Sequence, residues 1–264
     1  MAGLPPLRVP PAAVETEATP GQLAAMLARI GTYWAQVGLD APHWSVLVDE
    51  RFRPERIGGM EAHFYNTGLY DAELLRSALD RHGVRPAELP RCVEFGCGVG
   101  RVTVHLAGMF RRVTACDISA PHLALAKAAC AARGLTRVLT HRTTPEAPMP
   151  EGRWEAWFSA ITLQHNPPPL MRHLLGLGLA GLMRGGVAMF QIPTWLERYR
   201  FSVADYLAAT EPPAMEMHAL PQPAVFATIA AAGCEVLEVR EQPRAFGVDG
   251  ETGLSNLFLV RRPR

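Results

Sequence analysis

The sequence lacks an excess of either charge and lacks a long apolar run, and each absence excludes a class of partner. Its 26 Lys and Arg side chains nearly balance 25 Asp and Glu side chains, so the net charge of +1 creates no field that favours nucleic acid or an anionic membrane. The longest apolar stretch, around residues 174–183, is too short and too rich in glycine to span a bilayer. We therefore predict a partner that is neither nucleic acid nor membrane.

Paired cysteines and a signal peptide are also missing. The cysteines are odd in number and lack the spacing of a zinc site: Cys92, Cys97, Cys116, Cys130 and Cys234. Four of them fall in or beside predicted strands or a helix, where thiols pack as small hydrophobic groups. The first residues contain neither the basic region nor the apolar core of a signal peptide. These features predict a reduced, cytoplasmic protein.

The length and composition are those of one globular domain with a small appendage. Of the 264 residues, 48% are hydrophobic and 19% are charged, which excludes disorder for most of the chain. Residues 1–19 are rich in proline and lack periodicity, so we predict a flexible arm. A helical pattern begins at Pro20, where Thr19 and Gln22 form a capping box. Because an aromatic, irregular stretch follows, we predict an N-terminal helical cap or lid over residues 20–70.

From Asp71 the chain alternates helical and strand patterns, which is typical of a mostly parallel sheet with helices on both faces. Strands are expected at residues 91–95, 111–116, 137–141, 154–159, 186–192, 234–240 and 254–261. Helices are expected at residues 71–83, 101–109, 120–133, 168–184 and 222–232, with Gly134 and Gly185 ending two of them. We therefore predict an α/β fold with a seven-stranded, mostly parallel, doubly wound sheet whose last strand is antiparallel. This Rossmann-like domain would span residues 71–264, with an insertion at residues 193–221.

A glycine-rich loop follows the first predicted strand. Residues 94–101 read Glu-Phe-Gly-Cys-Gly-Val-Gly-Arg, an apolar strand that runs into a turn and opens a helix. Glycines suit this place because side chains would keep a ligand away from the backbone at the carboxyl edge of the sheet. The dinucleotide fingerprint requires a glycine at the position of Arg101, so the loop has a different pattern. It has instead an acidic residue at Glu94, followed by glycines at alternate positions.

Asp117 ends the second predicted strand, about 20 residues after the glycine loop. A carboxylate at this place can accept hydrogen bonds from both ribose hydroxyls of an adenosine, which fits either a dinucleotide or another adenosine cofactor. A charged cap at the start of the next helix is the structural alternative.

Four segments in this order resemble the motifs of class I S-adenosylmethionine-dependent methyltransferases: residues 94–100, 113–119, 157–168 and 185–190. The resemblance covers roughly residues 71–260. It implies S-adenosylmethionine as the cofactor and S-adenosylhomocysteine as the product. The cofactor-binding residues that it implies are Glu94, Gly96, Cys97, Gly98, Gly100, Arg101, Asp117, Ile118, Ser159 and Leu163. Tyr65 and Gly68 are expected to close the site from the N-terminal side, with plain packing as the alternative.

The acceptor side is expected after the fourth and fifth strands. His165 follows the fourth strand, and His218 lies in the insertion, so either histidine could act as the base for a hydroxyl acceptor. His165 could instead fix a turn next to the prolines that follow it. We expect Tyr199, Tyr206 and Glu216 of the insertion to contact the substrate.

No metal site is predicted, because residues 164–166 are Gln, His and Asn and lack the carboxylates that a hard cation prefers.

We predict methyl transfer to a small-molecule or saccharide acceptor, most simply at a hydroxyl. A nicotinamide-dependent oxidoreductase is the first alternative, and Arg101 and the two additional strands after residue 233 argue against it. A catalytically silent protein that binds the cofactor to regulate or scaffold a partner is the second alternative.

Overall fold

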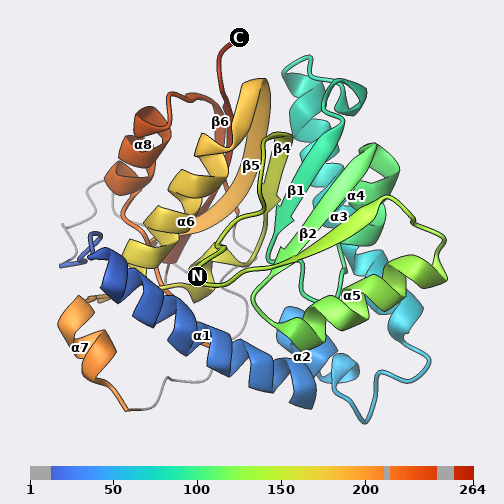
Figure 1. Ribbon diagram of the computed structural model, residues 1–264, viewed down its shortest axis with the longest axis horizontal. Helices are drawn as coiled ribbons and strands as arrows, with labels where there is room; N and C mark the ends of the chain where they lie inside the picture. Colours follow the sequence, from blue (N-terminus) through green and yellow to red (C-terminus); the bar gives the residue numbers. More distant parts are fainter. Residues whose placement is uncertain (1–12, 211–214, 243–252) are drawn as a thin grey trace, which may run out of the picture.

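Seven strands form one sheet in the order β3-β2-β1-β4-β5-β7-β6 in the computed structural model, which describes residues 13–210, 215–242 and 253–264 (Figure 1). The strands are β1 (Arg91–Phe95), β2 (Arg112–Asp117), β3 (Val138–Arg142), β4 (Trp154–Ser159), β5 (Leu182–Leu196), β6 (Glu235–Glu241) and β7 (Gly253–Arg261). Neighbouring strands from β3 to β5 pair in parallel, whereas β7 is antiparallel to both β5 and β6. The predicted fold class, including the antiparallel last strand, is therefore confirmed.

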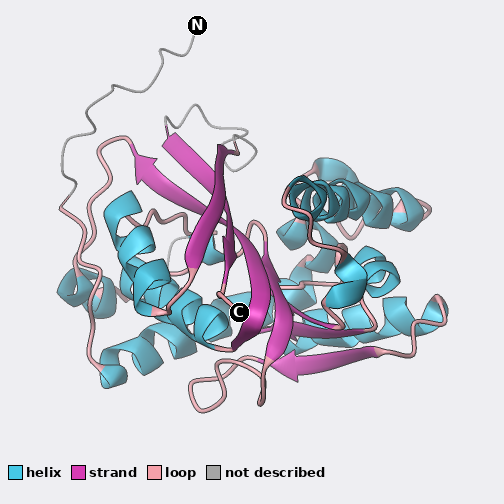
Figure 2. Ribbon diagram, turned by 90° about the horizontal axis from the view of Figure 1, so that it is seen from above, coloured by secondary structure: helices cyan, strands magenta, loops and turns pink. Residues whose placement is uncertain are grey.

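Helices cover both faces of this sheet (Figure 2). They are α1 (Pro20–Asp40), α2 (Pro42–Val46), α3 (Glu61–Arg81), α4 (Thr103–Met109), α5 (Ala120–Ala132), α6 (Pro168–Ala180), α7 (Val203–Ala208) and α8 (Gln222–Ala231), with short 3-10 turns η1 (Glu50–Phe52), η2 (Pro86–Glu88) and η3 (Leu163–His165). On β1, Val93 and Phe95 pack against α1, α6 and α8, whereas Cys92 packs against α3 and α4. The central strands are buried on both sides, as expected for a parallel sheet between two helical layers.

Helix α1 lies across the strand ends at the edge of the sheet where the glycine loop follows β1 (Figure 1). It begins at the predicted capping box, in which the Thr19 and Gln22 side chains each accept a hydrogen bond from the other residue's backbone. Met26, Leu27 and Ile30 are buried in the same core as α6. Because α1 also contacts α5, it joins the two helical layers at one edge of the sheet.

Two helix ends differ from the predicted ones by more than two residues. Helix α3 begins at Glu61 rather than after Asp71, because Phe64 and other residues before Asp71 are buried on the same helix. Asp71 lies inside this helix and forms an ion pair with Arg101, with a distance of 2.7 Å between Oδ2 and Nη2. Helix α6 ends at Ala180, so Gly185 belongs to β5 and does not end a helix.

Of the predicted N-terminal arm, the structure describes residues 13–19. Val14 forms a parallel bridge with Phe201, and the Glu15 carboxylate accepts a hydrogen bond of 2.6 Å from the backbone N–H of Val203. Residues 1–12 lie outside the described residues. Within the described ranges, no helix combines the length and apolar character needed to cross a membrane.

Candidate functional site

The glycine loop connects β1 to α4 with its backbone closely covered. Gly96 and Gly98 have φ angles of +79° and +53°, in the left-handed region that side chains with a Cβ rarely adopt. A Cβ at Gly96 would collide with Thr162, and a Cβ at Gly98 would collide with Val46 of α2. The loop therefore requires glycine for its conformation and for the close approach of two other segments.

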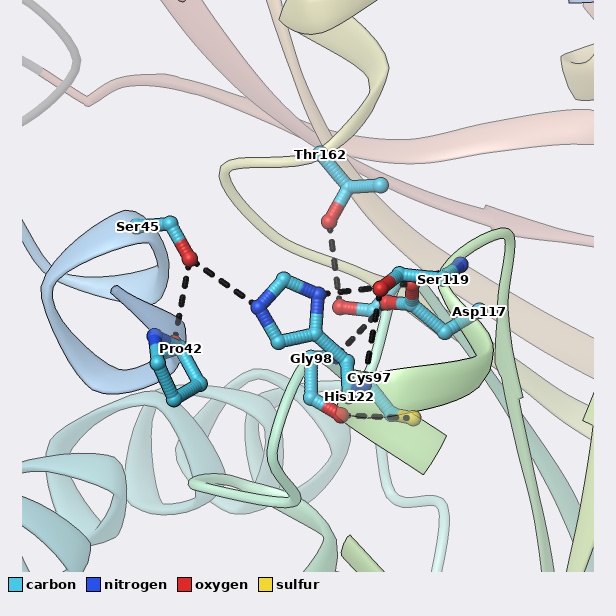
Figure 3. Close-up of polar contacts among 9 residues, drawn as sticks. Pro42, Ser45, Cys97, Gly98, Asp117, Ser119, His122 and Thr162 are labelled. Atoms are coloured by element: carbon cyan, nitrogen blue, oxygen red, sulfur yellow. Dashed lines mark hydrogen bonds and ion pairs between the residues drawn. The ribbon is translucent and has the colours of Figure 1, made fainter. Parts of the chain in front are cut away.

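Asp117 holds this loop from the end of β2. Its Oδ2 accepts a hydrogen bond of 2.8 Å from the Gly98 N–H, and its Oδ1 accepts one of 2.9 Å from the Ser119 N–H (Figure 3). Strands β1 and β2 are parallel neighbours, so their carboxyl ends place the loop and the carboxylate together. The Asp117 side chain keeps 11% of its surface exposed, toward the cavity described next.

A cavity lies at the carboxyl ends of β1, β2 and β4, where the strand order reverses between β1 and β4. Such a reversal is the usual ligand site in a doubly wound sheet. The sheet and its loops contribute Glu94, Phe95, Gly96, Cys97, Gly98, Arg101, Val102, Asp117, Ile118, His122, Thr143, Phe158, Ala160, Ile161, Thr162, His165 and Asn166. The N-terminal helices contribute Leu27, Ile30, Trp34, Ser45 and Val46.

The predicted cofactor residues fall into two groups. Those that line the cavity are Glu94, Gly96, Cys97, Gly98, Arg101, Asp117 and Ile118. Those that are not part of its lining are Tyr65, Gly68, Gly100, Ser159 and Leu163. The Tyr65 hydroxyl donates to the Val99 carbonyl at 3.2 Å, and the Ser159 hydroxyl donates to the Phe95 carbonyl at 3.0 Å. Tyr65 and Ser159 therefore bond to the backbone of the glycine loop and of the strand before it instead of lining the cavity.

Two ionisable side chains of the loop, Glu94 and Arg101, are buried, and their environments differ. Burial raises the pKa of Glu94 to about 8, and this carboxyl accepts a hydrogen bond of 2.5 Å from the Thr103 hydroxyl. A cationic ligand group next to Glu94 would favour its ionised form. Arg101 is neutralised by its ion pair with Asp71. The cavity can therefore accept a positively charged ligand group at Glu94. It does not offer Arg101 to a negatively charged ligand group, because Asp71 already pairs with this guanidinium.

His165 lies in η3, after β4, on another side of the cavity. Its Nδ1 is 2.8 Å from the Glu216 backbone carbonyl, so Nδ1 carries the proton and Nε2 holds the lone pair. Burial lowers the pKa of His165 to about 4, so the ring is neutral at physiological pH. The Gln164 amide nitrogen approaches Nε2 at 3.4 Å, a long hydrogen bond that an incoming hydroxyl could replace. Trp34 packs against the ring at 5.2 Å between centroids.

The predicted residues of the insertion form a cluster of their own. The Tyr199 hydroxyl donates to His218 Nδ1 at 2.7 Å, and His218 Nε2 is 3.1 Å from Glu216 Oε2. The Tyr206 hydroxyl donates to the same carboxylate oxygen at 2.9 Å. None of these four residues is among those that line the cavity. Within the described residues this cluster meets the η3 turn through backbone groups: the Glu216 carbonyl accepts from His165 Nδ1, and the His218 N–H donates to the Gln164 carbonyl at 2.8 Å.

Sequence reasoning did not select several residues that line the cavity. Three of them are Trp34, Ser45 and His122, and none of these belongs to a recognisable motif. Ile161 has a φ of +53°, an uncommon conformation for a β-branched residue, and its N–H donates to the Gln191 side chain at 2.9 Å. The amphipathic pattern of α1 is the one signal that pointed to a buried face, although it does not say which partner covers that face.

Residues 92–186, from β1 into β5, match the family model of a methyltransferase domain. This segment contains the glycine loop, Asp117 and His165. No curated protein matches the sequence.

Solved structures of three enzymes share the fold. Magnesium protoporphyrin IX methyltransferase from Synechocystis PCC 6803, with bound S-adenosylhomocysteine, is 15% identical with a TM-score of 0.60, covering 88% of this chain and 98% of that one. The N-methyltransferase NodS from Bradyrhizobium japonicum WM9 is 14% identical with a TM-score of 0.56, covering 89% and 100%. The cyclase SpnF is 14% identical with a TM-score of 0.53, covering 96% and 99%. At such low identity the likeness concerns the fold alone.

Proposed function

We propose that this chain is an S-adenosylmethionine-dependent methyltransferase of the class I family and that it transfers the methyl group to a hydroxyl of a small, neutral acceptor. The observation that carries the proposal is that the glycine loop, Asp117 and His165 line one cavity. This arrangement supports a cofactor site and a hydrogen-bonding group for the acceptor in the same cavity.

The residues of the cavity fit this cofactor in charge and in hydrogen bonding. Glu94 offers a buried carboxyl for the ammonium group, and the glycine loop offers bare backbone for the methionine part. Asp117 offers a carboxylate for the ribose, and Ile118 offers an apolar contact for the adenine. The Thr143 hydroxyl is buried in the same cavity without a hydrogen-bond partner among the described residues. When bound, the cofactor supplies an activated methyl group on a sulfonium.

The acceptor part of the cavity favours a neutral compound. Apart from the cofactor residues, its lining includes the apolar side chains of Leu27, Ile30, Trp34 and Ile161. A charged acceptor would need a counter-charge there, and the Arg101 guanidinium is already paired. A small molecule or a single sugar unit with an apolar ring face meets these conditions.

His165 would then act as the acceptor-side base. Its neutral Nε2 can accept the hydrogen bond of a hydroxyl and receive the proton as the oxygen attacks the methyl group. The Nδ1–H bond to the Glu216 carbonyl fixes the ring in the tautomer that this role requires. Trp34 and the surrounding apolar side chains exclude water from the reacting atoms.

Substitution of Asp117 by alanine should weaken S-adenosylhomocysteine binding by about 1.5–3 kcal/mol, roughly 10- to 150-fold, because a charged hydrogen-bond acceptor is lost. Asp117→Asn is the matched control, since it keeps one oxygen for the Gly98 N–H. Calorimetric titration of both variants, with their melting temperatures, checks the result. Wild-type affinity in a folded Asp117→Ala variant would contradict ribose binding at this carboxylate.

The acceptor class is tested by turnover. Release of S-adenosylhomocysteine should be stimulated by neutral phenols, alcohols or sugars more than by amines or carboxylic acids of similar size. Stimulation by charged amines alone would contradict the proposed acceptor, and cofactor binding without any stimulation would favour the silent, regulatory alternative.

A further inference from the structure

His122 occupies the first turn of α5, directly beside Asp117. Its side chain is 2% exposed and lines the cavity. The ring lies between two elements: Nε2 is 3.0 Å from the Ser45 hydroxyl of α2, and Nδ1 is 4.0 Å from Asp117 Oδ1 (Figure 3). No motif of the sequence selects this histidine.

The hydrogen bonds of Ser45 determine which ring nitrogen carries the proton. The Ser45 hydroxyl has one hydrogen, which it donates to the Pro42 carbonyl at 3.0 Å. Its oxygen must therefore accept from His122, so the proton of the ring lies on Nε2. Burial lowers the pKa of His122, which keeps the ring neutral and leaves a lone pair on Nδ1.

The ring has little room to turn away from this arrangement. A Cβ placed at Gly38 of α1 would lie 3.3 Å from both Nδ1 and Cε1 of His122, so the α1 backbone packs closely against it. The His122 backbone N–H also bonds to the Ser119 hydroxyl at 3.4 Å, at the start of α5. Two cap helices and the start of α5 thus hold Nδ1 beside the Asp117 carboxylate.

This neighbourhood offers hydrogen-bond acceptors and needs donors. Asp117 and the Nδ1 of neutral His122 are both acceptors, and at 4.0 Å they are too far apart for a direct hydrogen bond. A ligand with two adjacent hydroxyls supplies one donor to each. A ligand with a single donor would leave either Nδ1 without a partner or Asp117 with only its bonds to the Gly98 and Ser119 N–H groups. A buried acceptor without a partner costs binding free energy.

We propose that His122 is a second ribose-binding residue, whose Nδ1 accepts a hydrogen bond from one ribose hydroxyl while Asp117 accepts from the other. Ser45 is the positioning residue that fixes the tautomer. The inference rests on the proposed function, because it requires S-adenosylmethionine in the cavity. It also gives the N-terminal cap an indirect part in cofactor specificity, because Ser45 acts through His122.

The test compares S-adenosylhomocysteine with its 2′-deoxy and 3′-deoxy analogues by calorimetric titration. His122→Gln removes the acceptor at Nδ1, so its affinity for the parent ligand should fall about 3- to 10-fold. Its affinity for one of the two deoxy analogues should equal that of the wild type. His122→Asn places an amide oxygen near the Nδ1 position and should keep most of the discrimination.

Ser45 provides an independent variant in case His122 substitutions unfold the protein. Ser45→Ala should reduce discrimination between the ligand and that deoxy analogue, and Ser45→Thr should restore it. The imidazole ¹⁵N shifts of wild-type His122 should report a proton on Nε2. A proton on Nδ1, or unchanged discrimination in folded His122→Gln or Ser45→Ala, would overturn the inference.

Asp117→Ala separates this failure from failure of the proposed function. If Asp117→Ala weakens binding while His122→Gln does not change discrimination, the cofactor occupies the cavity and only the role of His122 is wrong. If neither substitution affects the ligand, the cofactor is not bound here, and both proposals fail.

Discussion

Turnover should fall by roughly a hundredfold or more when His165 is replaced by alanine, while affinity for S-adenosylhomocysteine stays nearly unchanged. The expected loss is that of general-base catalysis, because the lone pair on Nε2 of His165 would accept the proton of the acceptor hydroxyl. Cofactor affinity should persist because the described hydrogen bonds of Asp117 and Glu94 are to other residues and not to this ring. Steady-state rates and calorimetric titration of the same variant check both halves of the expectation.

His165→Asn is the matched control, because its amide nitrogen can replace the Nδ1–H that donates to the Glu216 carbonyl. This variant should keep the turn and the melting temperature but remain slow. If His165→Asn is as active as the wild type, the ring serves the turn and not the chemistry. A loss of cofactor affinity together with stability in His165→Ala would lead to the same conclusion.

The pH dependence follows from the buried ring. Because the pKa of folded His165 is lowered to about 4, the ring stays neutral as pH falls through 6.5. The rate should therefore fall through protonation of this base only near pH 4.

The same lowered pKa affects stability. In the unfolded chain His165 takes up a proton near pH 6.5, so its contribution to stability is present above that pH and is lost as pH falls toward 4. His165→Ala should therefore lose less stability than the wild type over this interval. Equal losses in acid melting curves would contradict a depressed pKa.

The sequence predicted the features that depend on short, continuous stretches of residues, namely the strands, the glycine loop and Asp117. The glycine loop and Asp117 follow adjacent strands, so local pattern and strand order were enough to place them at one edge of the sheet. The same argument predicted seven strands, because each has its own hydrophobic run and turn. These predictions depend on short stretches of residues and on the rules of parallel sheets.

The contribution of the cap could not be predicted in this way. Ser45 and Trp34 reach the cavity because α1 and α2 pack over the sheet edge, and that packing depends on side chains far apart in the sequence. Tyr206 and His218 were expected at the substrate because they lie in the insertion, yet that part of the chain turns them toward Glu216. A pattern assigns a residue to an element, whereas tertiary packing decides which surface its side chain reaches.

Gly98→Val should abolish measurable S-adenosylhomocysteine binding at micromolar concentrations. Its φ of +53° costs about 1–2 kcal/mol for a residue with a Cβ, and the new side chain would collide with Val46 of α2. Overpacking adds about 1–3 kcal/mol. The strain is relieved if the loop and α2 separate, but that movement removes the backbone geometry and the Gly98 N–H bond to Asp117.

Gly134→Val isolates the effect of the site from that of backbone strain. Gly134 follows α5 with a φ of +67°, and a Cβ placed there would meet no atom within 4 Å. Both variants therefore carry a valine in left-handed backbone, but only Gly98→Val disturbs the cavity. Both should lose some stability in thermal melts, and only Gly98→Val should lose the ligand. Retained affinity in Gly98→Val would show that the cofactor does not lie against this loop, whereas an equal loss in Gly134→Val would attribute the effect to strain at any glycine of this kind.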